Sequence, residues 1–324
     1  MKAIIPAAGI GKRLRPLTLT RPKVLLPVAG KPILGHILDR LIRSGIDEIV
    51  IIVGYKGDLV IDYVKRHYSV NVRFVEQRER KGLGHAVGMG LDDADEPVLI
   101  ILGDTILDVD YDRFVKSTEN IIGVMEVEDP RRFGIVETDG EKVKRLVEKP
   151  QEDIGNLAIA GIYLIQHANL LKKAVLHIVE QDITTKNEYQ LTDALQVMLD
   201  WNEPMVVARI DACFDCGTRV TLLETNRILL ERTATETAAY RNTVIIPPVT
   251  IGSEVSLENS VIGPFVSIGD KTRISRSVIE DTIVDEAAEI QTAILKETLA
   301  GQRTRIRGLA LGVDIGDDSE HDFS

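Results

Sequence analysis

The C-terminal part of the chain has a hydrophobic period that excludes most ways of folding it. Ile251 and Leu257 are six residues apart, as are Ile268 and Ile274, while Ile262 falls in a shifted position. A six-residue period matches neither an α-helix, which repeats every 3.6 residues or so, nor a half-buried strand. It is typical of a β-helix, in which each face of a triangular coil buries one apolar residue.

We expect residues 242–311 to form a left-handed parallel β-helix of roughly three or four coils. The repeat continues less regularly as far as Ile294. Residues 312–324 are rich in aspartate, and we expect them to form an acidic, frayed tail.

The first part of the chain has a different pattern, in which apolar runs alternate with amphipathic stretches. Strands are expected at 2–6, 48–53, 70–75 and 98–102, and helices at 33–44, 58–67 and 84–91. This alternation predicts an α/β domain with a mixed, mainly parallel sheet, whose carboxyl edge is the expected place for a ligand.

From residue 121 the pattern loosens, and we expect an inserted lobe. Its strands are expected at 121–127, 133–138, 143–147, 158–165 and 205–210, and its helices at 168–179 and 189–201. A further helix over 218–239 is expected to leave this domain, so that the α/β domain covers residues 1–241.

The charges of the chain are unevenly distributed. The net charge is −11, which argues against a general nucleic-acid binder, because such proteins carry a basic surface. Residues 1–38 nevertheless contain no acidic residue and seven lysines and arginines, which indicates a local anion site. No apolar run approaches the roughly 18 residues that span a bilayer. The N-terminal apolar stretch is too short for a signal peptide, so we expect a cytoplasmic protein without membrane contact.

The loop after the first expected strand has residues suited to a phosphate. Residues 7–14 read AAGIGKRL, in which glycines let backbone N–H groups approach a phosphate and cations supply charge. The pattern alone is weak, because a tight turn at the end of a strand would explain it as well. It also lacks the end of a Walker A loop and the third glycine of a dinucleotide fingerprint.

The continuation of this loop is more specific. Residues 13–18 read RLRPLT, and residues 21–32 read RPKVLLPVAGKP. This stretch resembles the signature of the sugar nucleotidylyltransferases, the family that includes glucose-1-phosphate thymidylyltransferases and uridylyltransferases. The resemblance covers residues 1 to 228 and implies a Rossmann-like nucleotidyltransferase domain.

The resemblance assigns the triphosphate to the N-terminal loop. It implies that Arg13 grips the triphosphate and favours the departure of pyrophosphate, and that Lys23 contacts phosphate between the two substrates. The nucleotide-binding loop residues are Ala8, Gly9, Gly11 and Arg13. Ala8 replaces the glycine of many thymidylyltransferases, which bears on the subfamily more than on the activity.

The reaction of this family needs charge neutralisation, since the sugar phosphate oxygen is already an anion that attacks the α-phosphorus directly. Residues 102–104 read LGD and residues 214–218 read FDCGT. Both motifs match those that supply the metal ligands in the family. The resemblance therefore implies Mg²⁺ held by Asp104 and Asp215, with Asp104 also counted as catalytic.

Two further sets of segments resemble those that read the substrates. Glu76-Gln77 and residues 81–86, KGLGHA, resemble the base segment, in which Gln77 would bind a pyrimidine and the backbone of Gly82 would complete the contact. Residues 133–137, FGIVE, and 148–150, EKP, resemble the sugar segment. The implied sugar-phosphate ligands are Gly134, Glu148, Lys149 and Ile159.

These features favour a nucleoside triphosphate, dTTP or UTP, and glucose 1-phosphate as substrates. The choice between thymine and uracil stays open, because room for one methyl group is worth only about 1–3 kcal/mol. Other readings are a mannose-1-phosphate guanylyltransferase, a hexapeptide acyltransferase and a non-catalytic regulatory subunit. Residues 242–320 contain no histidine for an acyltransferase base, and the four charged residues that a regulatory subunit should lack are present. We expect a homo-oligomer.

Overall fold

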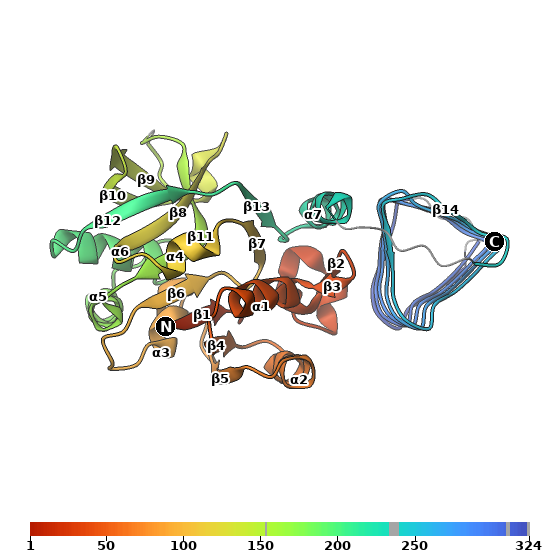
Figure 1. Ribbon diagram of the computed structural model, residues 1–324, viewed down its shortest axis with the longest axis horizontal. Coiled ribbons are helices and arrows are strands. Elements are labelled where there is room, and N and C mark those ends of the chain that lie inside the picture. The colour runs from red at the N-terminus through yellow and green to blue at the C-terminus, as the bar shows by residue number, and fades with distance from the viewer. Residues whose placement is uncertain (153, 233–239, 309–311, 323–324) are drawn as a thin grey trace. The chain divides into compact units, whose positions relative to one another are not determined.

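The computed structural model describes residues 1–152, 154–232, 240–308 and 312–322 (Figure 1). Contacts within the chain divide it into two compact units. The first consists of residues 1–9 and 37–213, and the second of residues 10–36 and 214–324. The segment that follows the first strand thus belongs with the C-terminal part. This division differs from the sequence domains expected at 1–241 and 242–311, which stay predictions.

The first unit is built on one nine-stranded sheet (Figure 1). Its strands are β1 (Lys2–Pro6), β4 (Glu48–Val53), β5 (Asn71–Glu76), β6 (Val98–Ile101), β8 (Asn120–Glu126), β9 (Gly134–Asp139), β10 (Lys142–Glu148), β11 (Leu157–Ile165) and β12 (Met205–Arg209). Their order across the sheet is β5-β4-β1-β6-β11-β8-β12-β10-β9.

The sheet is mixed, as expected, but only its first half is parallel throughout. β5, β4, β1 and β6 are parallel to one another, whereas β11 is antiparallel to both β6 and β8. β9 and β10 also pair antiparallel. β12 is parallel to β8 and antiparallel to β10, and the helices α5 (Ala168–Glu180) and α6 (Leu191–Asp200) lie between β11 and β12 in the chain, so the second half of the sheet mixes both kinds of pairing.

The central strands are buried on both faces. Ile4 in β1 and Ile51 in β4 have no exposed surface, which explains why these strands are almost wholly apolar in sequence. The helices α3 (Leu83–Gly90), α5 (Ala168–Glu180) and α6 (Leu191–Asp200) share one hydrophobic core with the sheet. This core fixes the carboxyl ends of β1 and β6, where the first loop and Asp104 begin.

The remaining elements before residue 216 are shorter or lie outside this sheet. They are α1 (Ile33–Arg43), α2 (Gly57–His67), α4 (Tyr111–Val115), β2 (Pro27–Val28), β3 (Lys31–Pro32), β7 (Thr105–Asp108), β13 (Ala212–Asp215), and the 3-10 turns η1 (Lys12–Leu14), η2 (Leu17–Leu19), η3 (Lys23–Leu25) and η4 (Pro130–Arg132). None of the helices in the described ranges is long and apolar enough to cross a membrane.

The helix α7 (Arg219–Glu231) belongs to the second unit. Thr218 caps it, because its side chain accepts a hydrogen bond from the backbone N–H of Thr221, while the Thr221 side chain accepts one from the N–H of Thr218. The expected helix over 218–239 is confirmed for 219–231, and residues 233–239 lie outside the described residues.

Three parallel sheets make the described part of the chain after residue 240 a β-helix, and Figure 1 shows its triangular coils end-on. The first sheet contains β14 (Val244–Ile245), β17 (Val261–Ile262), β20 (Val278–Glu280) and β23 (Ile294–Lys296). The second contains β15 (Val249–Ile251), β18 (Val266–Ile268), β21 (Ile283–Val284), β24 (Leu299–Ala300) and β26 (Asp314–Ile315). The third contains β16 (Ser256–Glu258), β19 (Arg273–Ser275), β22 (Glu289–Gln291), β25 (Arg305–Arg307) and β27 (Glu320–Asp322).

The coils are more numerous and less regular than expected. Two of the sheets have five strands, whereas the sequence predicted roughly three or four coils. Val249 pairs with Val266, seventeen residues on, but Ile283 pairs with Leu299 after sixteen and Leu299 with Asp314 after fifteen. A strict hexad would give eighteen residues for a coil of three faces, so the corners here are shortened. The left-handed sense of the coil stays a prediction.

The frayed acidic tail expected from residue 312 is wrong for the described residues 312–322. β26 and β27 continue the parallel pairing of β24 and β25. Ile315 is buried in the core of the β-helix, so one apolar residue continues the pattern among the aspartates. Residues 323 and 324 lie outside the described residues.

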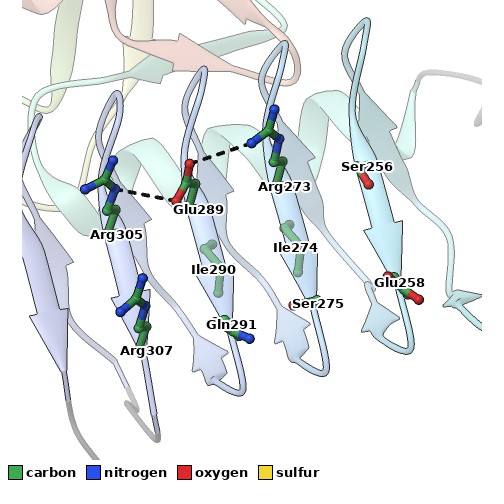
Figure 2. A pocket seen from close by; sticks show the side chains of 10 residues that line it. All are labelled: Ser256, Glu258, Arg273, Ile274, Ser275, Glu289, Ile290, Gln291, Arg305 and Arg307. Carbon is green, nitrogen blue, oxygen red and sulfur yellow. Dashed lines mark ion pairs between the residues drawn. The ribbon is translucent and has the colours of Figure 1, made fainter.

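The outward face of the third sheet carries alternating charge (Figure 2). Glu289 pairs with Arg305 at 3.5 Å and with Arg273 at 4.0 Å, each from a neighbouring coil. All three side chains are at least 46% exposed, and exposed ion pairs contribute little to stability. The inward residues Ile274 and Ile290 between these charges belong to the core.

Candidate functional site

The predicted base segment forms a set of contacts at the end of β5. Gln77 is buried, and its backbone N–H donates to the carbonyl oxygen of Val53 at 2.8 Å, next to the parallel pairing of β5 with β4. Its side-chain Nε2 donates to the carbonyl oxygen of Gly82 at 3.2 Å and lies 3.2 Å from Nδ1 of His85. The structure therefore brings Gln77 and Gly82 together.

The protonation of His85 decides what Gln77 can offer to a ligand. Burial lowers the pKa of His85, and the nearby Lys81 ammonium lowers it further. The lowered pKa favours the neutral imidazole at pH 7, and in the tautomer that carries its proton on Nε2, Nδ1 accepts a hydrogen bond from Nε2 of Gln77. Both amide hydrogens of Gln77 are then used within the protein. The group of this side chain that remains for a ligand is Oε1, which is a hydrogen-bond acceptor.

Gly82 has a conformation and surroundings that exclude any other residue. Its φ is +112°, and a Cβ atom would lie 2.5 Å from the carbonyl oxygen of Tyr189 and 2.7 Å from its nitrogen. Tyr189 in turn donates its N–H to the carbonyl oxygen of Lys81 at 2.7 Å and accepts from the N–H of Gly84 at 2.8 Å. The base segment is thus bonded along its backbone to the segment around Tyr189.

The four predicted sugar-phosphate ligands also lie together. A Cβ atom on Gly134 would lie 3.0 Å from Oε2 of Glu148 and 3.0 Å from Cδ1 of Ile159. Lys149 pairs with Oε1 of Glu148 at 2.9 Å, and the two side chains are 27% and 10% exposed. Lys149 has a φ of +48°, which is uncommon for a residue with a side chain. A non-glycine residue keeps a backbone conformation of this kind where the surrounding structure fixes it, and such residues occur often at functional sites.

Thr192 is the member of this site that the motifs did not reveal. Its Oγ1 donates to Oε2 of Glu148 at 2.8 Å. Thr192 lies three residues after Tyr189 in the chain. Asp193 follows it; burial raises the pKa of Asp193, and repulsion from Glu148 acts in the same direction.

The beginning of the phosphate loop belongs to the first unit. Ala8 and Gly9 follow directly after β1. Gly103 donates its N–H to the carbonyl oxygen of Pro6 at 3.1 Å, so the residues leading to Asp104 lie beside the start of this loop. Parallel strands place their carboxyl ends at one edge, which accounts for this neighbourhood.

The rest of the loop belongs to the second unit. Gly11 has a φ of +68°, and a Cβ atom on it would lie 2.9 Å from Cβ of Lys23. The Thr18 hydroxyl donates to the carbonyl oxygen of Gly11 at 2.9 Å, and both Thr18 and Lys23 are buried. Lys23 is therefore packed against the loop glycine rather than extended into solvent.

Arg13 and Asp215 meet at one glycine. A Cβ atom on Gly217 would lie 2.9 Å from Nη2 of Arg13 and 2.7 Å from Oδ1 of Asp215. The glycine two residues after the aspartate thus leaves room for both charged groups. The second unit brings these two predicted residues together, whereas Asp104 belongs to the first unit.

The predicted metal ligands have the right chemistry for Mg²⁺. Asp104 and Asp215 offer carboxylate oxygens, and Mg²⁺ is commonly bound by one or two carboxylates together with substrate phosphates and water. The described residues contain no group of three or more histidine, cysteine, aspartate or glutamate side chains that could hold a metal alone. The two carboxylates are thus donors of the kind that Mg²⁺ takes, and their role as metal ligands stays a prediction.

The fold defines the class of this protein, and comparison with known proteins gives its family. A nine-stranded α/β sheet with this loop, followed by a β-helix, defines a Rossmann-like protein with a C-terminal repeat domain. A family model described as nucleotidyl transferase matches residues 2–232, and the chain belongs to that family.

Relatives and solved structures agree with this membership. The bifunctional protein GlmU of Methanocaldococcus jannaschii is 37% identical over 238 residues, which are 73% of this chain and 56% of that protein. The chain thus spans little more than half the length of this relative. The UTP–glucose-1-phosphate uridylyltransferase AglF of Haloferax volcanii is 32% identical over 65% of this chain and 88% of its own. A UDP-glucose pyrophosphorylase solved with UDP-glucose superposes with a TM-score of 0.62 at 26% identity, covering 72% of this chain and 99% of its own.

Proposed function

We propose that the protein is a sugar-1-phosphate nucleotidylyltransferase that uses dTTP or UTP and glucose 1-phosphate, and releases pyrophosphate. The observation that carries the proposal is the connection between the two recognition segments. Gln77 and Gly82 are linked through the backbone of Tyr189 to Thr192, which holds Glu148. One short segment therefore contacts both the predicted base segment and the predicted sugar segment, as expected of an enzyme that joins a nucleotide to a sugar.

The reaction needs no nucleophilic side chain. An oxygen of the sugar phosphate forms a bond to the α-phosphorus, the bond from that phosphorus to the bridging oxygen breaks, and pyrophosphate leaves with the electron pair. Arg13 and Lys23 would offset the negative charge on the leaving group, and Lys149 would orient the attacking phosphate. Mg²⁺ held by Asp104 and Asp215 would supply further charge stabilisation when bound.

Oε1 of Gln77, the hydrogen-bond acceptor of this side chain, favours a base that carries an N–H on its ring. Uracil and thymine have N3–H, whereas N3 of cytosine and N1 of adenine are acceptors and would repel Oε1. Named relatives act on UTP and UDP-glucose, which supports a pyrimidine. A putative glucose-1-phosphate thymidylyltransferase from Bacillus anthracis, with a TM-score of 0.61, supports thymine equally.

We expect CTP and ATP to react at least about 100-fold more slowly than UTP or dTTP, judged by kcat/KM, because they would leave a buried acceptor unpaired. Pyrophosphate release from a panel of nucleoside triphosphates and sugar 1-phosphates, with Mg²⁺ present, measures this. GTP with mannose 1-phosphate belongs in the panel, because guanine also carries a ring N–H. Equal rates with CTP and UTP would refute the proposed preference for uracil or thymine. A protein that releases no pyrophosphate with any substrate pair would refute the proposed activity.

Replacing Lys149 by methionine should raise the KM for glucose 1-phosphate about tenfold or more, because a charge-assisted hydrogen bond to phosphate would be lost. The KM for the nucleotide should stay close to its original value. Lys144 offers the matched control, because it is 54% exposed and pairs with the exposed Asp139 at 3.5 Å. If Lys144→Met changes the sugar-phosphate KM as much as Lys149→Met does, general surface charge explains the effect.

A further inference from the structure

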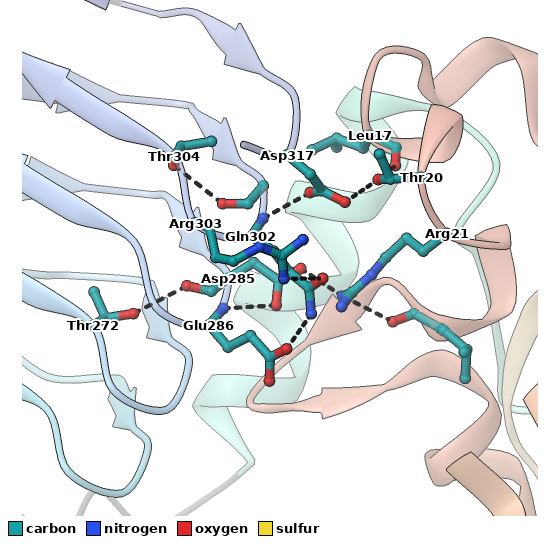
Figure 3. A network of polar contacts seen from close by, with 12 residues as sticks. Leu17, Thr20, Arg21, Thr272, Asp285, Glu286, Gln302, Arg303, Thr304 and Asp317 are labelled. Atoms are coloured by element: carbon teal, nitrogen blue, oxygen red, sulfur yellow. Dashed lines mark hydrogen bonds and ion pairs between the residues drawn. The ribbon is translucent and has the colours of Figure 1, made fainter. Parts of the chain in front are cut away.

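The turn that carries Lys23 is tied to the β-helix by an ion pair (Figure 3). Nη1 of Arg21 lies 2.5 Å from Oδ2 of Asp285, and it also donates to the carbonyl oxygen of Leu25 at 3.4 Å. Arg21 precedes η3 and Leu25 ends it. One guanidinium therefore holds both ends of the turn and connects them to a carboxylate 264 positions further along the chain.

Asp285 is held firmly in its own coil. It is 7% exposed, and its Oδ1 accepts the N–H of Glu286 at 2.8 Å, while Thr272 donates to its carbonyl oxygen at 3.0 Å. A buried carboxylate with these partners cannot move to follow Arg21. Breaking such a pair by removing one member leaves the other charge without a partner, which is costly.

Two more contacts attach the same segment to the β-helix. The Thr20 hydroxyl donates to Oδ2 of Asp317, whose Oδ1 accepts the N–H of Gln302 at 2.7 Å (Figure 3). A Cβ atom on Gly30 would lie 3.0 Å from Oγ1 of Thr250, so the turn between β2 and β3 lies directly on the strand β15.

Asn226 of α7 also joins the segment to the β-helix. It is fully buried, and its Oδ1 accepts hydrogen bonds from the N–H of Ala29 at 2.9 Å and from the Ser267 hydroxyl at 2.6 Å. Its Nδ2 donates to the carbonyl oxygen of Phe265 at 3.2 Å. Residues 20–30 are thus fixed to the coils by several independent contacts.

We propose that Asp285 is a positioning residue for the nucleotide: through Arg21 it fixes the turn that carries Lys23, and thereby sets the affinity for the triphosphate. The proposal rests on the proposed function, in which Lys23 contacts phosphate. Lys23 is packed against Gly11, so a shift of the turn would also disturb the phosphate loop. The β-helix in this sense supports the nucleotide site.

Asp285→Asn and Arg21→Gln should each lower kcat/KM for the nucleotide about 10- to 100-fold, because misplacement of a phosphate-binding group by about 1 Å has effects of this size. The KM for glucose 1-phosphate should change little. The double variant should be no worse than the worse single variant, because both act on one contact. The dissociation constant for inorganic triphosphate, measured by calorimetry, should rise in parallel with the nucleotide KM.

Asp281 supplies the matched control. It is 2% exposed and pairs with Arg227 of α7, so it is a buried carboxylate of the same β-helix with an arginine partner outside the Lys23 turn. Asp281→Asn should lower the melting temperature as Asp285→Asn does, without raising the nucleotide KM. Arg21→Lys, which keeps the charge, tests the proposal if Asp285→Asn does not fold; it should lose less affinity than Arg21→Gln.

The pH dependence gives a readout that a general loss of stability would not change. Burial raises the pKa of Asp285 to about 6, although Arg21 opposes this rise; Asp317 and Glu286 also face it and raise the pKa. Below pH 6 the carboxyl becomes neutral in the wild type, as it is at every pH in Asp285→Asn. The ratio of the two nucleotide KM values should therefore fall toward one as the pH is lowered through about 6.

A triphosphate dissociation constant that is unchanged in Asp285→Asn, or a ratio of KM values that is constant with pH, would overturn the positioning role. An equal rise in the nucleotide KM for Asp281→Asn would do the same. Failure of the proposed function appears separately, as a wild-type protein that releases no pyrophosphate with any substrate pair. Triphosphate binding by the wild type, Asp285→Asn, Arg21→Gln and Asp281→Asn would still decide the positioning role in that case.

Discussion

Replacing Asp104 by asparagine should lower kcat by about 100-fold or more, because loss of one group that stabilises the transition-state charge has effects of this order. Asparagine has nearly the same shape, so the contact between Gly103 and Pro6 that places this residue should remain. The same change at Asp215 should have a similar effect. Pyrophosphate release at saturating substrates, measured over a range of Mg²⁺ concentrations, gives kcat and the apparent metal affinity.

Asp108 provides the control for this pair of variants. It ends β7, the strand that begins at the residue after Asp104, and no metal or substrate role is proposed for it. Asp108→Asn should keep most of the activity and its Mg²⁺ dependence. If Asp104→Asn and Asp215→Asn both remain close to wild type while activity still requires Mg²⁺, the metal is bound by other groups and the assignment is wrong.

Replacing Gly82 by alanine should lower kcat/KM for the nucleotide by about 100-fold or more. The added Cβ atom would lie 2.5 Å from the carbonyl oxygen of Tyr189, and because that atom is backbone it cannot rotate away. The base segment would have to separate from Tyr189, which moves Gln77 on one side and Thr192 on the other. A displacement of about 1 Å of positioning groups costs a rate factor of this size. Steady-state kinetics for both substrates should show both KM values rising.

The variant Gly155→Ala separates the steric effect of an added Cβ atom from the effect of the backbone conformation. The φ of Gly155 is +110°, close to that of Gly82, but a Cβ atom on Gly155 would meet nothing within 4 Å. Gly155→Ala should therefore show the cost of the dihedral angle alone, with kinetics near those of the wild type. Equal losses in the two variants would mean that contact with Tyr189 has no special importance.

Much of the candidate site could be predicted because each motif lies at the end of a strand. Gln77 follows β5, which the alternation of strands and helices predicts, and Glu148 ends β10, which follows from the expected strand over 143–147. Local sequence also carries the glycines that such turns require. The groups of residues predicted for the base and for the sugar phosphate accordingly lie together in the structure.

The contacts that connect these motifs could not be predicted. Thr192 reaches Glu148 across 44 positions of the chain, and no local pattern indicates which of two distant polar residues will meet. The shortened coils have a similar origin. Their corners place residues such as Lys271, Ala287 and Thr292 at positive φ, a conformation that these residue types do not signal in advance. The paired strands after residue 312 could not be predicted from composition, because aspartates outnumber Ile315, the apolar residue that is buried there.

The long separation between Arg21 and Asp285 also sets the order in which the protein can be completed during synthesis. At about 5–20 residues per second, 264 positions correspond to roughly 13–50 seconds between the appearance of the two residues. The first unit includes only nine residues from before position 37, so its sheet can form while the Lys23 turn still lacks its support. A nascent chain would therefore form the predicted base and sugar segments early and fix the Lys23 turn last, after the coil containing Asp285 has formed.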